Sequence, residues 1–207
     1  MTGPQIEAHE HLETELAWWT ASDDFFEATA AATENLRVGG PAIDSRELRN
    51  ALGRFATGVC VVTTRAESGR TAGLTVNSFS AVSLDPPLVA WCLGRKAPSI
   101  RVFSEAGHFA VHVMAHDQHA LAMHFARPAD DKFAAVSDAF ESGIDNVPVL
   151  RDALARFECR KASMIDGGDH VIFLGRVERF VYADRPPLLF HAGRFLERSV
   201  ECSASLP

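Results

Sequence analysis

LTVNSFSAVSLDPPLVAWCL, residues 74–93, is the stretch that decides the fold. β-Branched and apolar residues dominate it and a double proline divides it, so it predicts two sheet strands joined by a turn. Asn77, Ser78, Ser80 and Ser83 place amide and hydroxyl groups inside these strands. Burying such groups without partners costs about 1–3 kcal/mol each. The polar groups therefore need either solvent or a binding partner.

Similar apolar runs continue on both sides of this stretch. Strands are predicted at residues 58–65, 71–84, 87–93, 108–114, 154–165, 170–183 and 187–199. After residue 40, helical spacing is confined to a short segment that begins at Asp44, where Asp44 and Glu47 resemble a capping box, and to residues 99–105 and 116–126. Many evenly spaced strands with two or three short helices favour a mainly β fold with helices, built as a closed β-barrel.

The composition is typical of a soluble globular protein. The chain has 207 residues, of which 47% are hydrophobic and 23% charged. No apolar run approaches the roughly 18–20 residues that a membrane span needs, and the N-terminus lacks the features of a secretory signal. The four cysteines form no C-x-x-C pair, so free thiols in a reducing cytoplasm are expected; they are Cys60, Cys92, Cys159 and Cys202.

The negative charge is concentrated at the N-terminus. Residues 1–40 contain eight acidic residues and one base, which accounts for the whole net charge of −7. The rest of the chain is balanced, and no basic surface for nucleic acid is indicated. The helical spacing of residues 12–36, ended by Gly39 and Gly40, predicts an acidic helical N-terminal extension over residues 1–40. Its aromatic residues favour packing against the following domain or a second subunit, and docking to a separate partner protein is the alternative.

The polar groups in the first strand favour a bound ligand. Gly73, Thr75, Asn77 and Ser78 gather small and hydrogen-bonding residues, which lets a flat ligand approach the backbone. The isoalloxazine ring of a flavin, apolar at one end and polar at the other, fits this description. A half-exposed strand would show the same alternation.

Two further groups of residues suggest binding. Lys96 and Ser99, with Pro98 between them, stand at the entry to a predicted helix, where unpaired N–H groups favour phosphate. Ser99 could instead serve only as the helix cap. The motif GGDH, residues 167–170, places His170 at the start of a strand, where it could contact a substrate amide. A histidine without a role at a barrel rim would look the same.

Other chemistries find less support. His112, His116, His119 and His124 invite a metal interpretation, but no acidic residue or cysteine is placed as an obvious third ligand. The chain has neither a G-x-G-x-x-G motif after a strand nor a Walker loop, and it lacks a G-x-S-x-G elbow.

Taken together, these segments resemble the short-chain flavin reductase family, the reductase components of two-component flavin-dependent monooxygenases. The resemblance runs in order from about residue 44 to residue 199. It is carried by LRNALGRFATGVCVVTT, GLTVNSFSAVSLDPPLVAWCL, HFAVHVMAHDQHALAMHFA, DKF, PVL, GGDHVIFLGRVE and PLLFHAGRF. Residues 1–40 lie outside the family core.

The resemblance implies a six-stranded split β-barrel, the FMN-binding split barrel, for residues 44–200. It also implies a homodimer that binds FMN or FAD between its subunits. The positions that match the flavin ring are Thr71, Ala72, Gly73, Leu74, Thr75, Asn77 and Ser78. Those that match the ribityl chain, the phosphate and the flavin tail are Cys92, Leu93, Gly94, Pro98, Ser99, His124, Phe125, Lys132 and Phe133. Many members carry Ser or Arg where this chain has Pro98. The nicotinamide motif matches Gly168, Asp169 and His170.

The function implied is hydride transfer from NADH or NADPH to FMN or FAD, after which reduced flavin serves a separate monooxygenase. His170 is expected to orient the nicotinamide, and no metal site, nucleic-acid partner or membrane partner is expected. Two alternatives remain open. One is a split-barrel protein that binds flavin without reductase turnover, and the other is a metal- or haem-handling protein that uses the histidine cluster.

Overall fold

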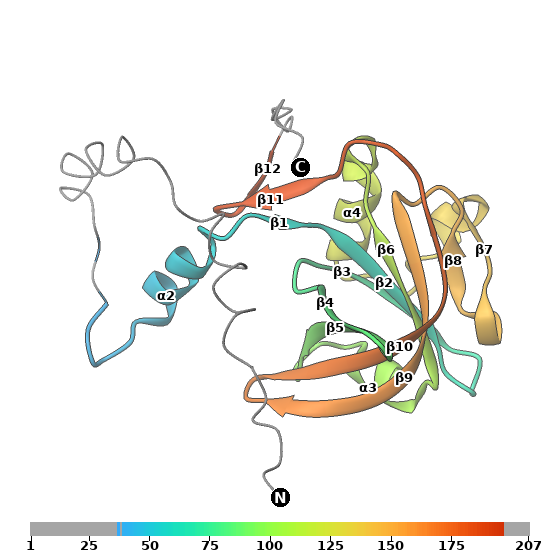
Figure 1. The fold of residues 1–207 in the computed structure, drawn as a ribbon, viewed down its shortest axis with the longest axis horizontal. Coiled ribbons are helices and arrows are strands. Elements are labelled where there is room, and N and C mark those ends of the chain that lie inside the picture. Colours follow the sequence, from blue (N-terminus) through green and yellow to red (C-terminus); the bar gives the residue numbers. More distant parts are fainter. Residues whose placement is uncertain (1–36, 38, 197–207) are drawn as a thin grey trace, which may run out of the picture. The chain divides into compact units, whose positions relative to one another are not determined.

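The computed structural model describes residue 37 and residues 39–196 (Figure 1). The predicted packing of the extension, residues 1–40, therefore lies almost wholly outside the described residues, as do residues 197–199 of the last predicted strand. The chain divides into two compact units, residues 1–48 and residues 49–207. All the described strands belong to the second unit.

Short helices accompany a large number of strands. Helix α2 (Ser45–Leu52) begins after Asp44, whose Oδ1 accepts hydrogen bonds from the backbone N–H groups of Arg46 and Glu47, both at 2.9 Å. The other helices are α3 (Ile100–Glu105), α4 (His119–Ala126) and the 3₁₀ helices η3 (His116–Gln118), η4 (Ala134–Ala139) and η5 (Ile144–Asn146). Among the described residues, no helix is long and apolar enough to cross a bilayer.

One antiparallel sheet of seven strands dominates the second unit. Its spatial order is β3 (Thr71–Val76), β2 (Cys60–Arg65), β6 (His108–Val113), β9 (Ala155–Gly167), β10 (His170–Tyr182), β5 (Pro87–Gly94) and β4 (Ser80–Leu84). A second sheet joins β1 (Thr57–Gly58), β11 (Leu189–His191) and β12 (Arg194–Phe195), and β7 (Phe140–Ser142) pairs with β8 (Pro148–Leu150).

The connection between β3 and β4 explains why the sheet curls. These strands stand at opposite edges of the seven-stranded sheet, yet only residues 77–79 separate them in sequence. A flat sheet of this width would span roughly 29 Å, whereas so short a connection reaches at most about 14 Å. The two edges must therefore come together, and Figure 1 shows the strands wrapping around a common interior. We call residues 77–79 the seam.

The seam also corrects one prediction from the sequence. The single strand expected over residues 71–84 is two strands, because the backbone must pass from one edge of the sheet to the other at residues 77–79. Because of this break, the large sheet has seven strands, whereas the predicted runs from residue 58 to residue 183 number six. The strand expected over residues 187–199 is likewise interrupted, because Ala192 (φ 48°) and Gly193 (φ 80°) form a tight turn between β11 and β12.

Aromatic side chains fill the interior of the barrel. Trp91 on β5 is fully buried and stacks on Phe173 of β10, with ring centroids 4.6 Å apart. The edges of Phe103 and Phe109 meet the same indole at 5.0 Å and 5.7 Å. This cluster holds β5, β6, β10 and α3 together, since burial of each aromatic ring removes a large apolar area from water.

The described cysteines are unpaired: Cys60, Cys92 and Cys159. Burial raises the pKa of the Cys60 thiol and of the Cys159 thiol to about 12, and nearby carboxylates add to the effect at Cys159. In the described part of the chain, no group of three or more histidine, cysteine and acidic side chains is arranged to hold a metal ion.

His112 on β6 is a buried histidine with a strongly lowered pKa. Its Nδ1–H donates to the carbonyl of Val61 at 2.9 Å, and its Nε2 has no hydrogen-bond partner among the described residues. The pKa of His112 is lowered from 6.5 to about 4, chiefly by burial and also by the nearby charge of Arg156, against the opposing effects of the Val61 carbonyl and Glu158. The imidazole is therefore neutral in the folded protein at neutral pH.

This burial predicts a loss of stability in mild acid. Between about pH 6.5 and pH 4 the unfolded chain binds a proton at His112 that the folded chain does not, so the free energy of unfolding falls as the pH is lowered. From pH 7 to pH 5 the loss from this residue is about 2 kcal/mol. Urea denaturation at both pH values should show it. The variant His112→Gln, which cannot titrate, should lose correspondingly less, and an equal loss in both proteins would contradict the prediction.

Candidate active site

A cavity of about 900 Å³ opens beside strand β3. One wall is the strand itself, a second is the entry to α3, and a third is the end of α4 with the loop that follows it. The residues that line it are Gly69, Arg70, Thr71, Ala72, Gly73, Leu74, Thr75, Ala97, Pro98, Ser99, Val102, Phe125, Ala126, Pro128, Ala129, Asp130, Asp131, Lys132 and Phe133.

The cavity collects half of the predicted binding residues. They come from four separate segments of the sequence: Thr71, Ala72, Gly73, Leu74 and Thr75 from β3, Pro98 and Ser99 before α3, Phe125 from α4, and Lys132 and Phe133 from the loop. The predicted residues that do not line it are Asn77, Ser78, Cys92, Leu93, Gly94, Lys96, His124, Gly168, Asp169 and His170.

Gly73 allows aromatic rings to pack directly on the strand. The rings of Phe125 and Phe133 lie 5.3 Å apart, edge to face, and Phe125 is fully buried. A Cβ atom at residue 73 would lie 2.6 Å from the Phe125 ring and 3.2 Å from the Phe133 ring. Only glycine fits here without displacing an aromatic side chain, so the ring positions and the cavity wall depend on this residue.

Lys132 brings a positive charge to the cavity wall. Its Nζ donates to the carbonyl of Phe125 at 2.7 Å, and partial burial lowers the pKa of Lys132. His124 braces the same loop from outside the cavity, since its Nε2 lies 2.7 Å from the carbonyl of Lys132. Asp131 shapes the loop by accepting hydrogen bonds from the backbone N–H groups of Phe133 and Ala134 at 2.8 Å and 3.1 Å.

Ser99 and Lys96 are separated by the structure. Ser99 lines the cavity just before α3, and its side chain makes no capping hydrogen bond to that helix. A role as a helix cap alone therefore lacks support. Lys96 does not line the cavity and lies instead near Asp169, where its charge is the smallest of the effects that lower the pKa of that carboxyl group.

Several polar groups of residues 74–93 have partners within the protein. The Thr75 hydroxyl donates to the carbonyl of Ala122 at 2.5 Å and so ties β3 to α4. The Ser78 hydroxyl accepts from the backbone N–H of Cys92 at 3.0 Å and donates to the carbonyl of the same residue at 3.3 Å. Ser78 therefore ties the seam to β5. Among these groups, the side chain of Asn77 is exposed.

His170 occupies the first position of β10, directly opposite Gly94 at the end of β5. Its Nδ1 lies 2.7 Å from a carboxylate oxygen of Asp169, and its side chain is 50% exposed. This hydrogen bond is the main reason why the pKa of Asp169 is lowered. The carboxylate accepts a hydrogen bond from Nδ1–H, which leaves Nε2 free to contact a ligand.

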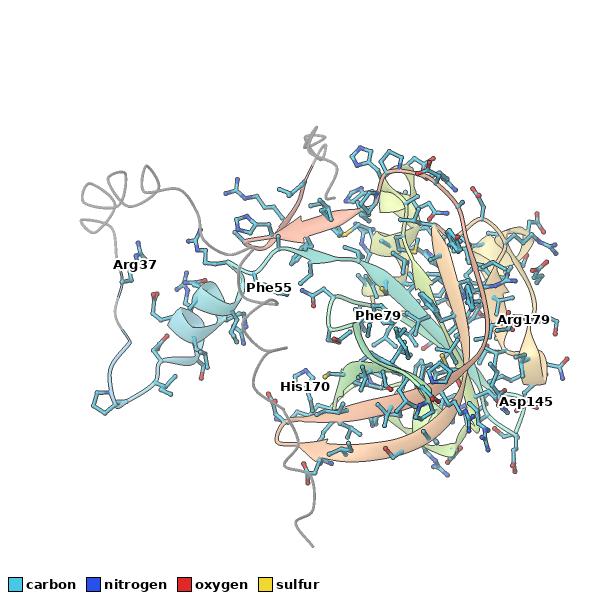
Figure 2. The ribbon with its side chains drawn as sticks, viewed as in Figure 1. Arg37, Phe55, Phe79, Asp145, His170 and Arg179 are labelled. Carbon is cyan, nitrogen blue, oxygen red and sulfur yellow. The ribbon has the colours of Figure 1, made fainter. Side chains whose placement is uncertain are left out.

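The histidine and the cavity adjoin the same short segment. Residue 94 pairs with His170, while residues 97–99 form part of the cavity wall. Figure 2 shows His170 at the end of the β9–β10 hairpin, whereas Arg179 lies far along the same strand. His170 therefore lies beside one end of residues 94–99, and the cavity lies beside the other end.

Sequence reasoning missed nine residues of the cavity wall. They are Gly69, Arg70, Ala97, Val102, Ala126, Pro128, Ala129, Asp130 and Asp131. Pro128, Asp130 and Asp131 had a usable signal, because a proline and an aspartate directly before the DKF motif, which itself begins at Asp131, indicate a shaped loop after the helix. The others carry no distinctive chemistry in the sequence.

A family profile described as "Flavin reductase like domain" matches residues 52–198. The chain belongs to this family. The FMN reductase (NADH) SmoA of Agrobacterium fabrum is 45% identical over 172 residues, which is 82% of this chain and 94% of that protein. The reductase component of the flavin-dependent trigonelline monooxygenase of Acinetobacter baylyi is 40% identical over 150 residues, 72% of this chain but only 48% of that protein.

Among solved structures of flavin reductases, the NADH:FAD oxidoreductase SgcE6 of Streptomyces globisporus, in complex with NAD and FAD fragments, superposes with a TM-score of 0.74. The two chains are 36% identical, and the match covers 82% of this chain and all of SgcE6. The predicted fold, mainly β with few helices and built as a flavin reductase split barrel, is therefore confirmed.

Proposed function

We propose that this chain is an NAD(P)H-dependent flavin reductase of the EC 1.5.1 type, which transfers hydride from NADH or NADPH to FMN or FAD. The observation that carries the proposal is the pairing of the cavity beside β3 with the exposed His170 at the adjoining strand end. The names of the relatives support it, since SmoA is an FMN reductase that uses NADH and SgcE6 is an NADH:FAD oxidoreductase.

The residues of the cavity fit a flavin. A flat ring system suits the part of β3 that lines the cavity, and the partly buried ring of Phe133 offers apolar contact, while the buried ring of Phe125, packed on Gly73, supports the wall from behind. Lys132 supplies a cation for an anionic tail, and the hydroxyl of Ser99 offers a further hydrogen bond. When bound, the flavin supplies the hydride-accepting ring, and the protein contributes binding and orientation.

His170 is the residue proposed to orient the nicotinamide. Because Asp169 holds the proton on Nδ1, Nε2 can accept a hydrogen bond from the nicotinamide amide group. Orientation lowers the barrier by holding donor and acceptor atoms in a reactive arrangement, and hydride transfer needs no general acid or nucleophile from the protein.

Reduced flavin is proposed to leave for a partner monooxygenase. The trigonelline enzyme is one relative that is named as the reductase component of a flavin-dependent monooxygenase. A homodimer is also proposed, because Phe180, Val181 and Tyr182 expose apolar surface at the end of β10. We retain the division into an extension, residues 1–40, and a reductase domain, residues 44–200, and we place the reaction in the cytoplasm, where free thiols persist.

The proposal is tested by oxidation of NADH and NADPH with FMN, FAD and riboflavin in parallel. Oxidation that requires added flavin supports the reductase, and riboflavin separates binding of the ring from binding of the phosphate. Tight flavin binding without turnover would favour the flavin-binding alternative instead. Metal analysis of the purified protein tests the metal- and haem-handling alternative.

Replacing His170 with alanine should impair use of the nicotinamide. We expect kcat/KM for NADH to fall about 10-fold, equivalent to about 1.4 kcal/mol of transition-state stabilisation. Flavin affinity should change little, because His170 does not line the cavity. Steady-state kinetics and a flavin titration measure the two effects separately. If flavin binding fell by the same factor, the assigned role would be wrong.

A further inference from the structure

The turn that precedes His170 is exposed, and the sheet supports it on one side only, where β10 pairs with β5 as far as His170 and Gly94. Residues 162–170 are all exposed, although most of them belong to strand β9. Strand β6 pairs with β9 only as far as Arg160, so the outer part of β9 has β10 as its one strand partner in the described sheet. Gly168, with φ at 75°, makes the tight turn between the two strands. A turn built in this way needs an anchor if it is to hold His170 in one place.

Arg95, the residue that follows β5, supplies such an anchor through three separate contacts. Its Nε donates to the carbonyl of Gly168 at 2.8 Å, and its backbone N–H donates to the carbonyl of Asp169 at 2.9 Å. Its guanidinium also forms an ion pair with the carboxylate of Asp166. The same carboxylate oxygen accepts a hydrogen bond from the N–H of Gly168 at 3.2 Å. Arg95 therefore contacts the turn at Asp166, Gly168 and Asp169.

These contacts contribute to position more than to global stability. The side chains of Arg95 and Asp166 are 45% and 78% exposed, and exposed ion pairs typically contribute about 0–1 kcal/mol. Their effect on the position of the turn is larger than their effect on stability, because the guanidinium contacts a turn that ends one residue before His170. Small displacements of an orienting group can reduce a rate substantially even when the fold is intact.

We propose that Arg95 is a positioning residue for hydride transfer, which fixes the 167–169 turn and through it the place of His170 opposite Gly94. This inference rests on the proposed function, and it assigns Arg95 no contact with the flavin or the nicotinamide. The planar fork of arginine matters here, because one side chain reaches both a carbonyl and a carboxylate. Lysine would keep the charge but could not hold both partners in the same geometry.

The experiment compares Arg95→Ala and Arg95→Lys with the full chain and with Arg101→Ala. Arg101 is the matched control, because it is an exposed arginine on nearby α3 whose ion pair with Glu105, at 2.7 Å, does not involve the turn. For Arg95→Ala we expect KM for NADH to rise about 5-fold or more while flavin Kd stays within about 2-fold. Amide hydrogen exchange in residues 163–172 should become faster, and the Tm should shift little. Arg95→Lys should resemble Arg95→Ala, and Arg101→Ala should resemble the unchanged chain.

Each outcome decides between support and rejection. Unchanged exchange and unchanged KM in Arg95→Ala would overturn the inference. A parallel loss of flavin affinity and Tm would also overturn it, since Arg95 would then support the fold in general. If the unchanged chain oxidised no nicotinamide with any flavin, the proposed function would fail, whereas the exchange measurement would still show whether Arg95 anchors the turn.

Discussion

Replacing Gly73 with valine is expected to weaken flavin binding by about 10- to 100-fold. Strain from overpacking typically costs about 1–3 kcal/mol, and each factor of ten in Kd corresponds to about 1.4 kcal/mol. The first added carbon already lies 2.6 Å from the ring of Phe125, and that ring is fully buried and packed against Phe133 and Phe140, so it cannot yield without leaving this packing. The backbone of β3 or the Phe125 ring must therefore shift into the cavity.

Titration of the protein with FMN, followed by flavin fluorescence, measures this effect. Gly107→Val is the matched control, because a Cβ atom at residue 107 would meet no atom within 4 Å. Near-ultraviolet circular dichroism should confirm that both variants are folded. Wild-type affinity for FMN in a folded Gly73→Val protein would show that flavin binds somewhere other than this cavity.

Replacing Trp91 with alanine should lower the free energy of unfolding by about 3–5 kcal/mol. The indole is fully buried among Phe103, Phe109 and Phe173, so its removal leaves a void that these rings cannot fill without leaving their present packing. Urea denaturation of the variant measures the loss.

Trp91→Phe provides the comparison for this prediction. The Nε1–H of Trp91 has no hydrogen-bond partner among the described residues, and phenylalanine removes that unpaired donor while it keeps an aromatic ring. Trp91→Phe should therefore cost clearly less than Trp91→Ala. A loss below about 1 kcal/mol for Trp91→Ala would mean that the aromatic cluster contributes little to stability.

The strands were predictable because their side chains follow a local pattern. The runs at residues 58–65, 108–114 and 170–183 correspond closely to β2, β6 and β10. The seam at residues 77–79 was not predictable, since it follows from which strands become neighbours across the whole sheet. The β7–β8 hairpin was also missed, because strands of three residues are too short to show a period.

The sequence predicted which residues belong to the site better than it predicted where these residues lie relative to one another. Family resemblance pointed to Phe125 and Lys132, whose place beside β3 no local pattern could indicate. The predicted helix entry grouped Lys96 with Ser99, whereas the structure places Lys96 near Asp169. The role of Arg95 escaped prediction because its partner Gly168 is 73 residues away in sequence, and only the folded sheet brings β5 beside the β9–β10 turn.

The burial of Cys60 and Cys159 affects how readily these thiols are oxidised. Free reduced flavin reacts with oxygen and yields hydrogen peroxide, which oxidises cysteine through its thiolate form. With a pKa of about 12, the thiols of Cys60 and Cys159 hold only about one part in 100,000 of thiolate at pH 7. Both are also closed off from solvent. Burial in the barrel thus protects these two residues from oxidation to sulfenic acid.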